Sequence, residues 1–461
     1  MAHDDEFSVE SVYADLLSRA PESKMEPRLD PLFRVMELLG DPQKAYPVIH
    51  LTGTNGKTST ARIIEAGLRA LGLRTGRYTS PHLAKVTERI SVDGEPVADA
   101  TFVKIWDEIR PVLDMVDHEL ADEGEPRLTY FECLTILGFA VFADEPIDVA
   151  VVEVGLGGIT DATNVADGQV AVVTPISADH TDLLGETLTE IALEKSGIIK
   201  EGGFLVSAAQ PVEAAQVLLE RAQEVEAPFR FQGVEFGVDA RVMGVGGQQL
   251  TISGLAGTYE DLLLPLHGIH QSQNAAVAVA ALEAFIGGGQ KALETDVLRE
   301  AFAEVTSPGR MEVVRAAPTT IIDAAHNPDG ARATAGAVLE SFSLSKLVIV
   351  LGALREKDAQ GIVTELKDSL AELNPVFCFT QSSSPRAIPA EQLAEDAVGW
   401  GVPSESVFVQ PALDDAIEWA VARSEEDNDL AGGILITGSI TVVGEARTLL
   451  LPKGSANGPA D

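Results

Sequence analysis

Hydrophobic positions along the chain fall into two patterns, short continuous apolar runs and longer stretches in which apolar residues recur every three or four positions. Residues 147–154 and 169–176 are near-continuous apolar runs, typical of strands buried on both faces of a parallel sheet. Helical spacing marks the stretches around them, among them residues 99–120 and 129–143. Strands separated by helices predict right-handed βαβ units, and therefore a doubly wound α/β domain in the first half of the chain.

An earlier apolar run introduces the first candidate site. Residues 47–52 predict a buried strand and residues 58–71 a helix, with a short turn between them that contains Gly53 and Gly56. Small residues in such a turn let backbone N–H groups converge on an anion at the helix N-terminus. A turn of this composition could arise by chance. Its place between a strand and a helix favours phosphate binding.

Two side chains at the end of this turn support the same interpretation. Lys57 adds a positive charge for the β- and γ-phosphates of a nucleotide, and the hydroxyl of Thr58 can reach a Mg²⁺. The usual P-loop has a further glycine at the position of Leu51, so this loop is a shortened variant. We therefore predict a P-loop ATPase domain.

The pattern changes in the second half of the chain. Residues 229–266 alternate, with Gly-Gly turns and few helix formers, which predicts a small antiparallel β appendage. A Ser-Pro-Gly turn at residues 307–309 then precedes a second series of strands and helices, which predicts a smaller Rossmann-like α/β domain. We expect an N-terminal domain over residues 1–306 and a C-terminal domain over residues 307–461, with a disordered tail at residues 452–461.

Composition narrows the classes of partner. The 461 residues include 71 acidic and 33 basic side chains, for a formal net charge of −38. Such a charge argues against nucleic acid or an anionic membrane as partner, and it requires that any anionic substrate be captured by locally concentrated Lys, Arg, metal and N–H groups. Cys133 and Cys378 lie far apart along the chain, each in an apolar run. This pattern predicts two buried thiols in a reducing compartment, without a disulfide or metal pair. With no membrane span and no signal-peptide core, we expect a cytoplasmic protein.

Polar residues at strand ends are the next candidates, because ligands bind there in doubly wound sheets. Glu153 ends an apolar strand, as does the carboxylate that holds the nucleotide's Mg²⁺ in P-loop enzymes. A surface salt bridge is the simpler alternative, but a glutamate in an apolar run needs compensation, and a metal supplies it. His180 follows the next strand and is either a core or capping histidine or a ligand, although Mg²⁺ prefers oxygen. Lys195 and Lys200, taken alone, are most simply solvated.

Several motifs together carry a family resemblance that covers nearly the whole chain. They run in family order: Gly53–Ser59, Thr79–Leu83, Leu128–Glu132, Glu153–Gly158, Asp161–Asn164, Asp179–Thr181, Glu194–Ile198, His270–Gln271 with Asn274–Ala276, Pro308–Arg310 and Asp323–Pro328. With these motifs the chain resembles folylpolyglutamate synthase/dihydrofolate synthase, a branch of the Mur ligase superfamily of ATP-dependent amide-bond-forming enzymes.

The resemblance implies roles for the phosphate loop and for the metal site. Lys57 and the loop would hold the ATP phosphates, and His180 would be a Mg²⁺ ligand together with Ser80 and Glu153. Lys195 matches a family lysine that becomes carbamylated, and its new carboxylate-like group would bind a second Mg²⁺. Lys57, His180 and Lys195 are therefore the predicted catalytic residues. The last four of the predicted ATP-contacting residues match family positions that clamp the nucleotide between the domains. The full set is Thr54, Asn55, Gly56, Lys57, Thr58, Asn274, Arg310, Asp323 and His326.

The resemblance also implies a pterin-binding region. Its predicted members are Arg28, Leu29, Asp30, Thr129, Tyr130, Phe131, Glu132, Thr160, Asp161 and Ala162. Two departures from the family pattern stand out. The family has an arginine where this chain has Ile159-Thr160, which removes an anion contact beside the pterin, and the usual Asp-Lys-Asp is Glu356-Lys357-Asp358.

The expected reaction joins the carboxylate of dihydropteroate or a reduced folate to the amine of L-glutamate, through an acyl phosphate, in a monomeric enzyme. A peptidoglycan-type ligase acting on a UDP-sugar peptide is the nearest alternative, but only about fifty residues precede the phosphate loop, too few for a UDP-binding domain. A P-loop NTPase without ligase chemistry would leave the second domain with Asp323 and His326 unexplained. The retention of every proposed ligand position weighs against a non-catalytic nucleotide-binding module.

Overall fold

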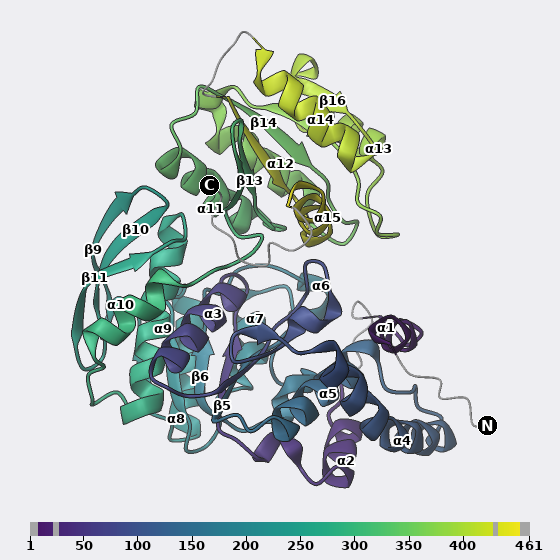
Figure 1. Ribbon diagram of the computed structural model, residues 1–461, viewed down its shortest axis with the longest axis vertical. Coiled ribbons are helices and arrows are strands. Elements are labelled where there is room, and N and C mark those ends of the chain that lie inside the picture. Colours follow the sequence, from purple (N-terminus) through teal and green to yellow (C-terminus); the bar gives the residue numbers. More distant parts are fainter. Residues whose placement is uncertain (1–7, 22–26, 427–431, 452–461) are drawn as a thin grey trace. The chain divides into compact units, whose positions relative to one another are not determined.

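The computed structural model describes residues 8–21, 27–426 and 432–451, so the predicted tail at 452–461 lies outside the described residues. The described chain forms two compact units (Figure 1). The first comprises residues up to 241 together with 250–263 and 273–305, and the second comprises 242–249, 264–272 and the residues from 306 onward. The assignment of an ATP- and pterin-binding domain to 1–306 and a ligase domain to 307–461 stays a prediction.

The first unit is built on a sheet with the strand order β4-β3-β2-β5-β1-β6-β7-β8. All neighbouring pairs from β2 across to β8 are parallel, and the β2–β3 and β3–β4 pairs at one edge are antiparallel. The strands are β1 (Val48–Thr52), β2 (Thr75–Tyr78), β3 (Ile90–Val92), β4 (Glu95–Pro96), β5 (Val149–Glu153), β6 (Gly168–Val173), β7 (Phe204–Ser207) and β8 (Phe229–Phe231). This mixed, mainly parallel sheet confirms the predicted doubly wound α/β fold.

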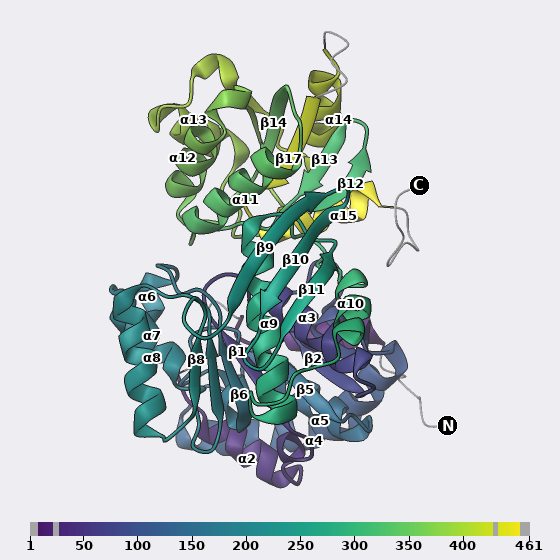
Figure 2. The ribbon, with the colours of Figure 1, turned by 90° about the vertical axis from the view of Figure 1, so that its left-hand side faces the viewer.

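Helices cover both faces of this sheet (Figures 1 and 2), which is why every residue of β1 and β5 is buried. Ala150 and Val152 of β5 belong to a core with Trp106 and Phe139, whereas Ala171 of β6 belongs to a second core. The helices are α1 (Val9–Leu17), α2 (Asp30–Leu38), α3 (Lys57–Ala70), α4 (Asp99–Glu123), α5 (Tyr130–Asp144), α6 (Thr181–Leu184), α7 (Leu188–Ser196), α8 (Val212–Glu224), α9 (Ile269–Gly287) and α10 (Thr295–Ala303).

The predicted β appendage exists but begins later in the chain than expected. β9 (Gly237–Gly244), β10 (Gly247–Ser253) and β11 (Thr258–Leu264) form a separate three-stranded sheet (Figure 2). The prediction was wrong for Phe229–Phe231, which is β8 and pairs in parallel with β7 at the edge of the large sheet. Phe229 and Phe231 pack against the core that contains Leu205, and this packing holds them in the large sheet.

The second unit contains a six-stranded sheet with the order β12-β13-β17-β14-β15-β16. Only β12 runs antiparallel, and parallel strands alternating with helices confirm the Rossmann-like prediction. The elements are β12 (Glu312–Ala316), β13 (Thr319–Ile322), α11 (Pro328–Ser341), β14 (Lys346–Leu351), α12 (Ala359–Ser369), β15 (Val376–Phe379), α13 (Ala390–Gly399), β16 (Val407–Val409), α14 (Leu413–Ser424), β17 (Gly432–Thr437) and α15 (Ile440–Leu450).

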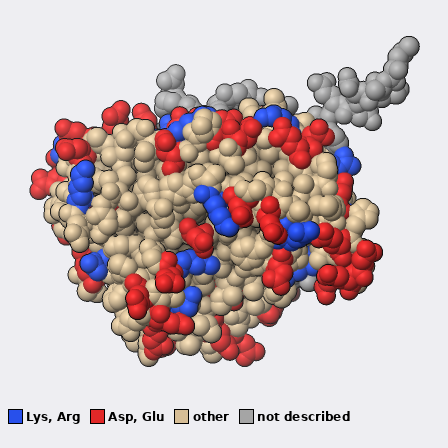
Figure 3. Space-filling view, turned by 90° about the horizontal axis from the view of Figure 1, so that it is seen from below, with Lys and Arg blue, Asp and Glu red and all other residues tan. Residues whose placement is uncertain are grey.

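The charges at the surface and the burial of the two cysteines agree with what the composition predicts. Figure 3 shows Asp and Glu side chains gathered over the face it presents, with Lys and Arg as separate spots among them. Cys133 and Cys378 are buried free thiols, and burial raises the pKa of both, that of Cys378 to about 12. Among the helices of the described residues, none combines the length and the apolar character that crossing a bilayer requires.

Candidate active site

The candidate residues of the first unit converge because their strands are neighbours. β1 lies between β5 and β6, with Leu51 opposite Glu153 and Thr52 opposite Val173. The loop after β1 therefore lies between the end of β5, which carries Glu153, and the segment after β6, which carries His180. β2 is the next strand beyond β5, so Ser80, two residues after the end of β2, lies at the same edge of the sheet.

The loop after β1 is packed too tightly for side chains at its two glycines. Gly53 and Gly56 have φ angles of 143° and 89°, in the region that favours glycine. A Cβ at Gly53 would overlap the Thr174 hydroxyl, and one at Gly56 would lie 2.6 Å from Asn274 Oδ1. The structure therefore brings Asn274, on α9, directly against the phosphate loop, although 218 residues along the chain separate it from Gly56.

Two lysines meet at one carbonyl of this loop. Lys57 Nζ and Lys195 Nζ each donate to Gly53 O at 3.0 Å, and Lys57 also donates to Thr54 O at 3.2 Å. Lys195, in the last turn of α7, is 3% exposed. Its burial, and then the charge of Lys57, lower the pKa of Lys195 to about 7. Two amino groups therefore meet at the phosphate loop of a strongly acidic protein, and Lys57 supplies positive charge for an anion there.

Glu153 is buried at the end of β5 and pairs with a hydroxyl from the phosphate loop. Thr58 Oγ1 lies 3.0 Å from Glu153 Oε1 and 2.9 Å from Oε2. A carboxylate and a hydroxyl are the oxygen donors that Mg²⁺ prefers. This donor set therefore fits a Mg²⁺ site. Glu153 is 1% exposed, and this burial excludes the alternative of a surface salt bridge.

His180 and Ser80 lie at the same sheet edge without forming an evident ligand group by themselves. His180 caps α6 with a φ of 51°, and its Nε2 is 4.0 Å from Asp179 Oδ2. Within the described ranges, no three His, Cys, Asp or Glu side chains group closely enough to hold a metal. Metal roles for Ser80 and His180 therefore rest on the family resemblance.

The predicted pterin-binding stretches around Arg28 and residues 129–132 meet in space. Arg28 Nε donates to Glu132 Oε1 at 3.4 Å, and Arg28 Nη2 donates to Arg127 O at 3.3 Å. The Arg89 guanidinium lies over the Tyr130 ring, 5.4 Å from its centroid. Basic and aromatic groups are thus assembled where α5 begins.

Thr129 and Glu132 also have a structural role there, because they form a capping box at the start of α5. Thr129 Oγ1 accepts from Glu132 N at 3.2 Å, and Glu132 Oε2 accepts from Thr129 N at 2.6 Å. We expect Thr129→Ala to lower the free energy of unfolding by about 1 kcal/mol, the usual cost of losing an N-cap. Urea titration followed by circular dichroism measures it. Thr129→Ser keeps the hydroxyl, and an equal loss in that variant would contradict the capping role.

The third predicted pterin-binding stretch, residues 160–162, is part of a firmly held loop after β5. Thr160 donates to Glu194 Oε1 from its amide at 3.3 Å and from its hydroxyl at 3.4 Å. Asp161 is buried, and desolvation raises the pKa of its carboxyl. Hydrogen bonds from Thr163 and nearby amides oppose this rise without cancelling it. Ile159, where the family has arginine, is 42% exposed.

Arg310, Asp323 and His326 form a compact group in the second unit. Arg310 Nη1 donates to Ala324 O at 3.2 Å, and His326 Nδ1 lies 2.9 Å from the same oxygen. Asp323 is buried and accepts from Met311 N, Ala325 N and Thr334 Oγ1 at 2.7 to 2.9 Å. The three residues are thus positioned together at the end of β13.

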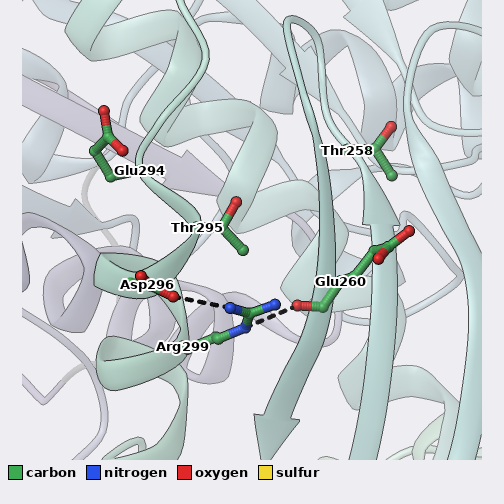
Figure 4. Close-up of a pocket in the computed structure, with 6 residues that line it drawn as sticks. All are labelled: Thr258, Glu260, Glu294, Thr295, Asp296 and Arg299. Carbon is green, nitrogen blue, oxygen red and sulfur yellow. Dashed lines mark hydrogen bonds and ion pairs between the residues drawn. The ribbon is translucent and has the colours of Figure 1, made fainter.

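A polar pocket of about 370 Å³ lies in the first unit, beside β11 and the start of α10 (Figure 4). Arg299 crosses it, donating to Asp296 Oδ1 at 2.8 Å and to Glu260 O at 3.1 Å. None of the predicted site residues is among its lining residues, which are Thr258, Glu260, Glu294, Thr295, Asp296 and Arg299.

Sequence inspection missed the residues that hold the phosphate loop from β6. Thr54 N donates to Pro175 O at 2.9 Å, and Ser177 N donates to Thr54 Oγ1 at 3.0 Å. The sequence signal for these contacts was weak, because Thr174 and Pro175 look like an ordinary strand end. Only their position beside β1 gives them a function.

Comparison with known proteins decides the family. Two family models match, the Mur ligase middle domain over residues 51–282 and the glutamate ligase domain of Mur ligases over 309–440. A dihydrofolate synthase/folylpolyglutamate synthase of Mycobacterium tuberculosis is 46% identical over 453 residues, covering 94% of this chain and 91% of that protein. The chain belongs to the folylpolyglutamate synthase/dihydrofolate synthase family of Mur ligases. This confirms the resemblance seen in the motifs.

Solved structures of the family agree in fold over almost the full length. The M. tuberculosis folylpolyglutamate synthase complexed with ADP and AMPPCP has a TM-score of 0.90 at 44% identity, covering 96% of this chain and 98% of that one. An FPGS–AMPPCP–folate complex has a TM-score of 0.81 at 30% identity, covering 97% and 100%. The fold of this chain is therefore shared with family members that were solved with a nucleotide and with folate.

Proposed function

We propose that this protein joins L-glutamate to the carboxylate of dihydropteroate, of a reduced folate, or of both, with ATP converted to ADP and phosphate. The observation that carries the proposal is the meeting of Lys57, Lys195 and the Thr58–Glu153 pair at one phosphate loop. Relatives named as folylpolyglutamate synthases support the choice of substrates.

The reaction needs an activated carboxylate, because a carboxylate is a poor electrophile at neutral pH. Its oxygen attacks the γ-phosphorus of ATP, the bond to the ADP oxygen breaks, and an acyl phosphate forms. The deprotonated glutamate amine then adds to the acyl carbon, and phosphate leaves from the tetrahedral intermediate. Lys57 and the loop amides from Gly56 to Thr58 stabilise the charge that spreads over the phosphoryl oxygens.

Glu153, Thr58, Ser80 and His180 are the residues we propose for Mg²⁺, with the family resemblance supporting the last two. When bound, Mg²⁺ supplies Lewis-acid stabilisation of phosphoryl oxygens. Lys195 is proposed to be carbamylated and to bind a second Mg²⁺. Its burial and lowered pKa support this role, because a neutral amine is the form that reacts with CO₂.

The remaining sites are proposed for the nucleotide and the pterin. Asn274 is proposed to touch the nucleotide, which its position against Gly56 supports, and Arg310, Asp323 and His326 are assigned to ATP on the resemblance. The pterin is assigned to the segments that contain Arg28–Asp30, Thr129–Glu132 and Thr160–Ala162. We further propose that the enzyme works as a cytoplasmic monomer without nucleic-acid or membrane partners. Its net charge of −38 and its two free thiols support this setting.

The test is ADP release in the presence of ATP, Mg²⁺ and L-glutamate, with dihydropteroate and a tetrahydrofolate supplied in turn. We expect at least one pterin to stimulate ADP release strongly, and only when glutamate is present. The pattern across the two acceptors tells mono- from bifunctional activity. If neither acceptor stimulates release, the substrate assignment fails, and hydrolysis that needs no amino acid would favour a non-ligase NTPase.

A further inference from the structure

Two side chains of β1 hold the loop that follows β5. His50 and Thr52 are two positions apart, so they point to the same face of the sheet. Thr52 Oγ1 donates to Gly157 O at 2.7 Å, and His50 Nε2 lies 2.8 Å from Thr163 Oγ1. His50, Thr52 and Thr163 are all fully buried. The strand that presents the phosphate loop therefore also ties down both ends of the neighbouring loop, residues 155–163.

The hydrogen bonds of Thr163 determine the tautomer of His50. Thr163 Oγ1 donates to Asp161 Oδ1 at 2.5 Å, and a hydroxyl has only one proton to give. Thr163 must therefore accept from His50, which requires a proton on Nε2. His50 Nδ1 is buried and has no hydrogen-bond partner among the described residues, as expected for the unprotonated nitrogen. Burial also lowers the pKa of His50 to about 3, so the ring is neutral at physiological pH.

Asp161 carries the effect of this chain of bonds into the loop. Its Oδ1 also accepts from Thr163 N at 3.0 Å, and its Oδ2 accepts from Leu156 N at 2.9 Å. One carboxylate thus bridges the start and the end of the loop, and the Thr163 hydroxyl fixes its orientation. Since Asp161 lies between Thr160 and Ala162, a rotation of its carboxylate would break the bonds that hold the segment proposed to contact the pterin.

We propose that His50 is a positioning residue for the folyl substrate, acting through Thr163 and Asp161 to hold loop 155–163 in its binding geometry. The inference rests on the proposed function for the identity of the ligand. The simpler alternative is that His50 only satisfies polar groups in the core. That alternative predicts a loss of stability without a selective effect on folyl binding.

Paired threonine variants test the link through which His50 is proposed to act. Thr163→Val removes the hydroxyl at nearly constant volume, and Thr163→Ser retains it. We expect Thr163→Val to raise KM for the folyl substrate about tenfold, the effect of losing a buried hydrogen bond, with KM for ATP changed less than twofold. Thr163→Ser should stay within twofold of wild type in both. Thr437→Val is the matched control, because the Thr437 hydroxyl is also buried but has no hydrogen-bond partner among the described residues.

Two measurements that need no turnover test the positioning itself. Hydrogen exchange should show faster exchange of amides 155–163 in Thr163→Val than in wild type or Thr163→Ser. The ¹⁵N spectrum of histidine-labelled protein, with the His50 signals assigned by their loss in His50→Gln, should show a neutral ring protonated on Nε2. A proton on Nδ1, unchanged loop exchange, or parallel changes in both KM values would overturn the inference. A wild-type protein without glutamate-dependent turnover would instead overturn the proposed function, while the exchange and ¹⁵N results would still report on the loop.

Discussion

Lys57→Ala is expected to abolish glutamate-dependent ADP release, with kcat reduced by about 10³-fold or more. Removal of one fixed donor to a developing oxyanion costs about 10²–10³ in kcat, and charged groups on a transferring phosphoryl can be worth about 10³–10⁵. Lys57 lies 3.0 Å from Gly53 O, within the loop that would surround the phosphates. The overall charge of −38 leaves little other positive potential for that task.

The assay for Lys57→Ala is steady-state ADP release at saturating ATP, folyl acceptor and L-glutamate. Lys44→Ala is the matched control, because Lys44 is an exposed lysine of the same unit whose ion pair with Asp41 lies on the surface. The control should retain wild-type rates. Glutamate-dependent turnover in Lys57→Ala within tenfold of wild type would contradict the phosphate-loop assignment.

The elements that sequence predicted well are those buried on both faces or strongly periodic. The apolar run 147–154 became β5, and the spacing over 99–120 became α4. Elements whose identity depends on their neighbours were not predicted. β12 is half exposed and is a strand because it pairs with β13, and β8 was assigned to the wrong sheet because alternation over three residues does not say which edge they join.

The candidate site shows a similar division. The phosphate loop was readable from the order of strand, glycines, lysine and helix. The meeting of Lys195 with Gly53 was not, because 142 residues separate them and only the folded chain brings the last turn of α7 to the phosphate loop. The stretch from Thr129 to Glu132 was predicted both to open a helix and to bind substrate; the structure shows in addition that its hydroxyl and carboxylate form a capping box on α5. His50 gave no signal, since a lone histidine in an apolar run is most often structural.

Glu153→Gln is expected to reduce kcat by about 10²–10³-fold and to raise the Mg²⁺ concentration needed for half-maximal rate. The substitution keeps the volume of a side chain that is 1% exposed, and an amide oxygen can still accept from Thr58 Oγ1. What it removes is the negative charge, which strengthens the binding of a hard cation. Loss of a metal's stabilisation of phosphoryl charge is comparable to loss of a fixed oxyanion donor, which sets the expected scale.

The Mg²⁺ dependence distinguishes this effect from simple misfolding. In the absence of nucleotide, Glu153→Gln should bind the folyl substrate as wild type does. It should also unfold in urea much as wild type does, since burying a neutral amide costs less than burying a charge. Glu220→Gln, an exposed change on α8, is the control for loss of one negative charge and should leave both kcat and the Mg²⁺ requirement unchanged. A Glu153→Gln enzyme with a wild-type Mg²⁺ titration would remove Glu153 from the metal site. In that case the Thr58–Glu153 contact would serve only to anchor α3 against β5, because these two residues join the first turn of that helix to the end of that strand.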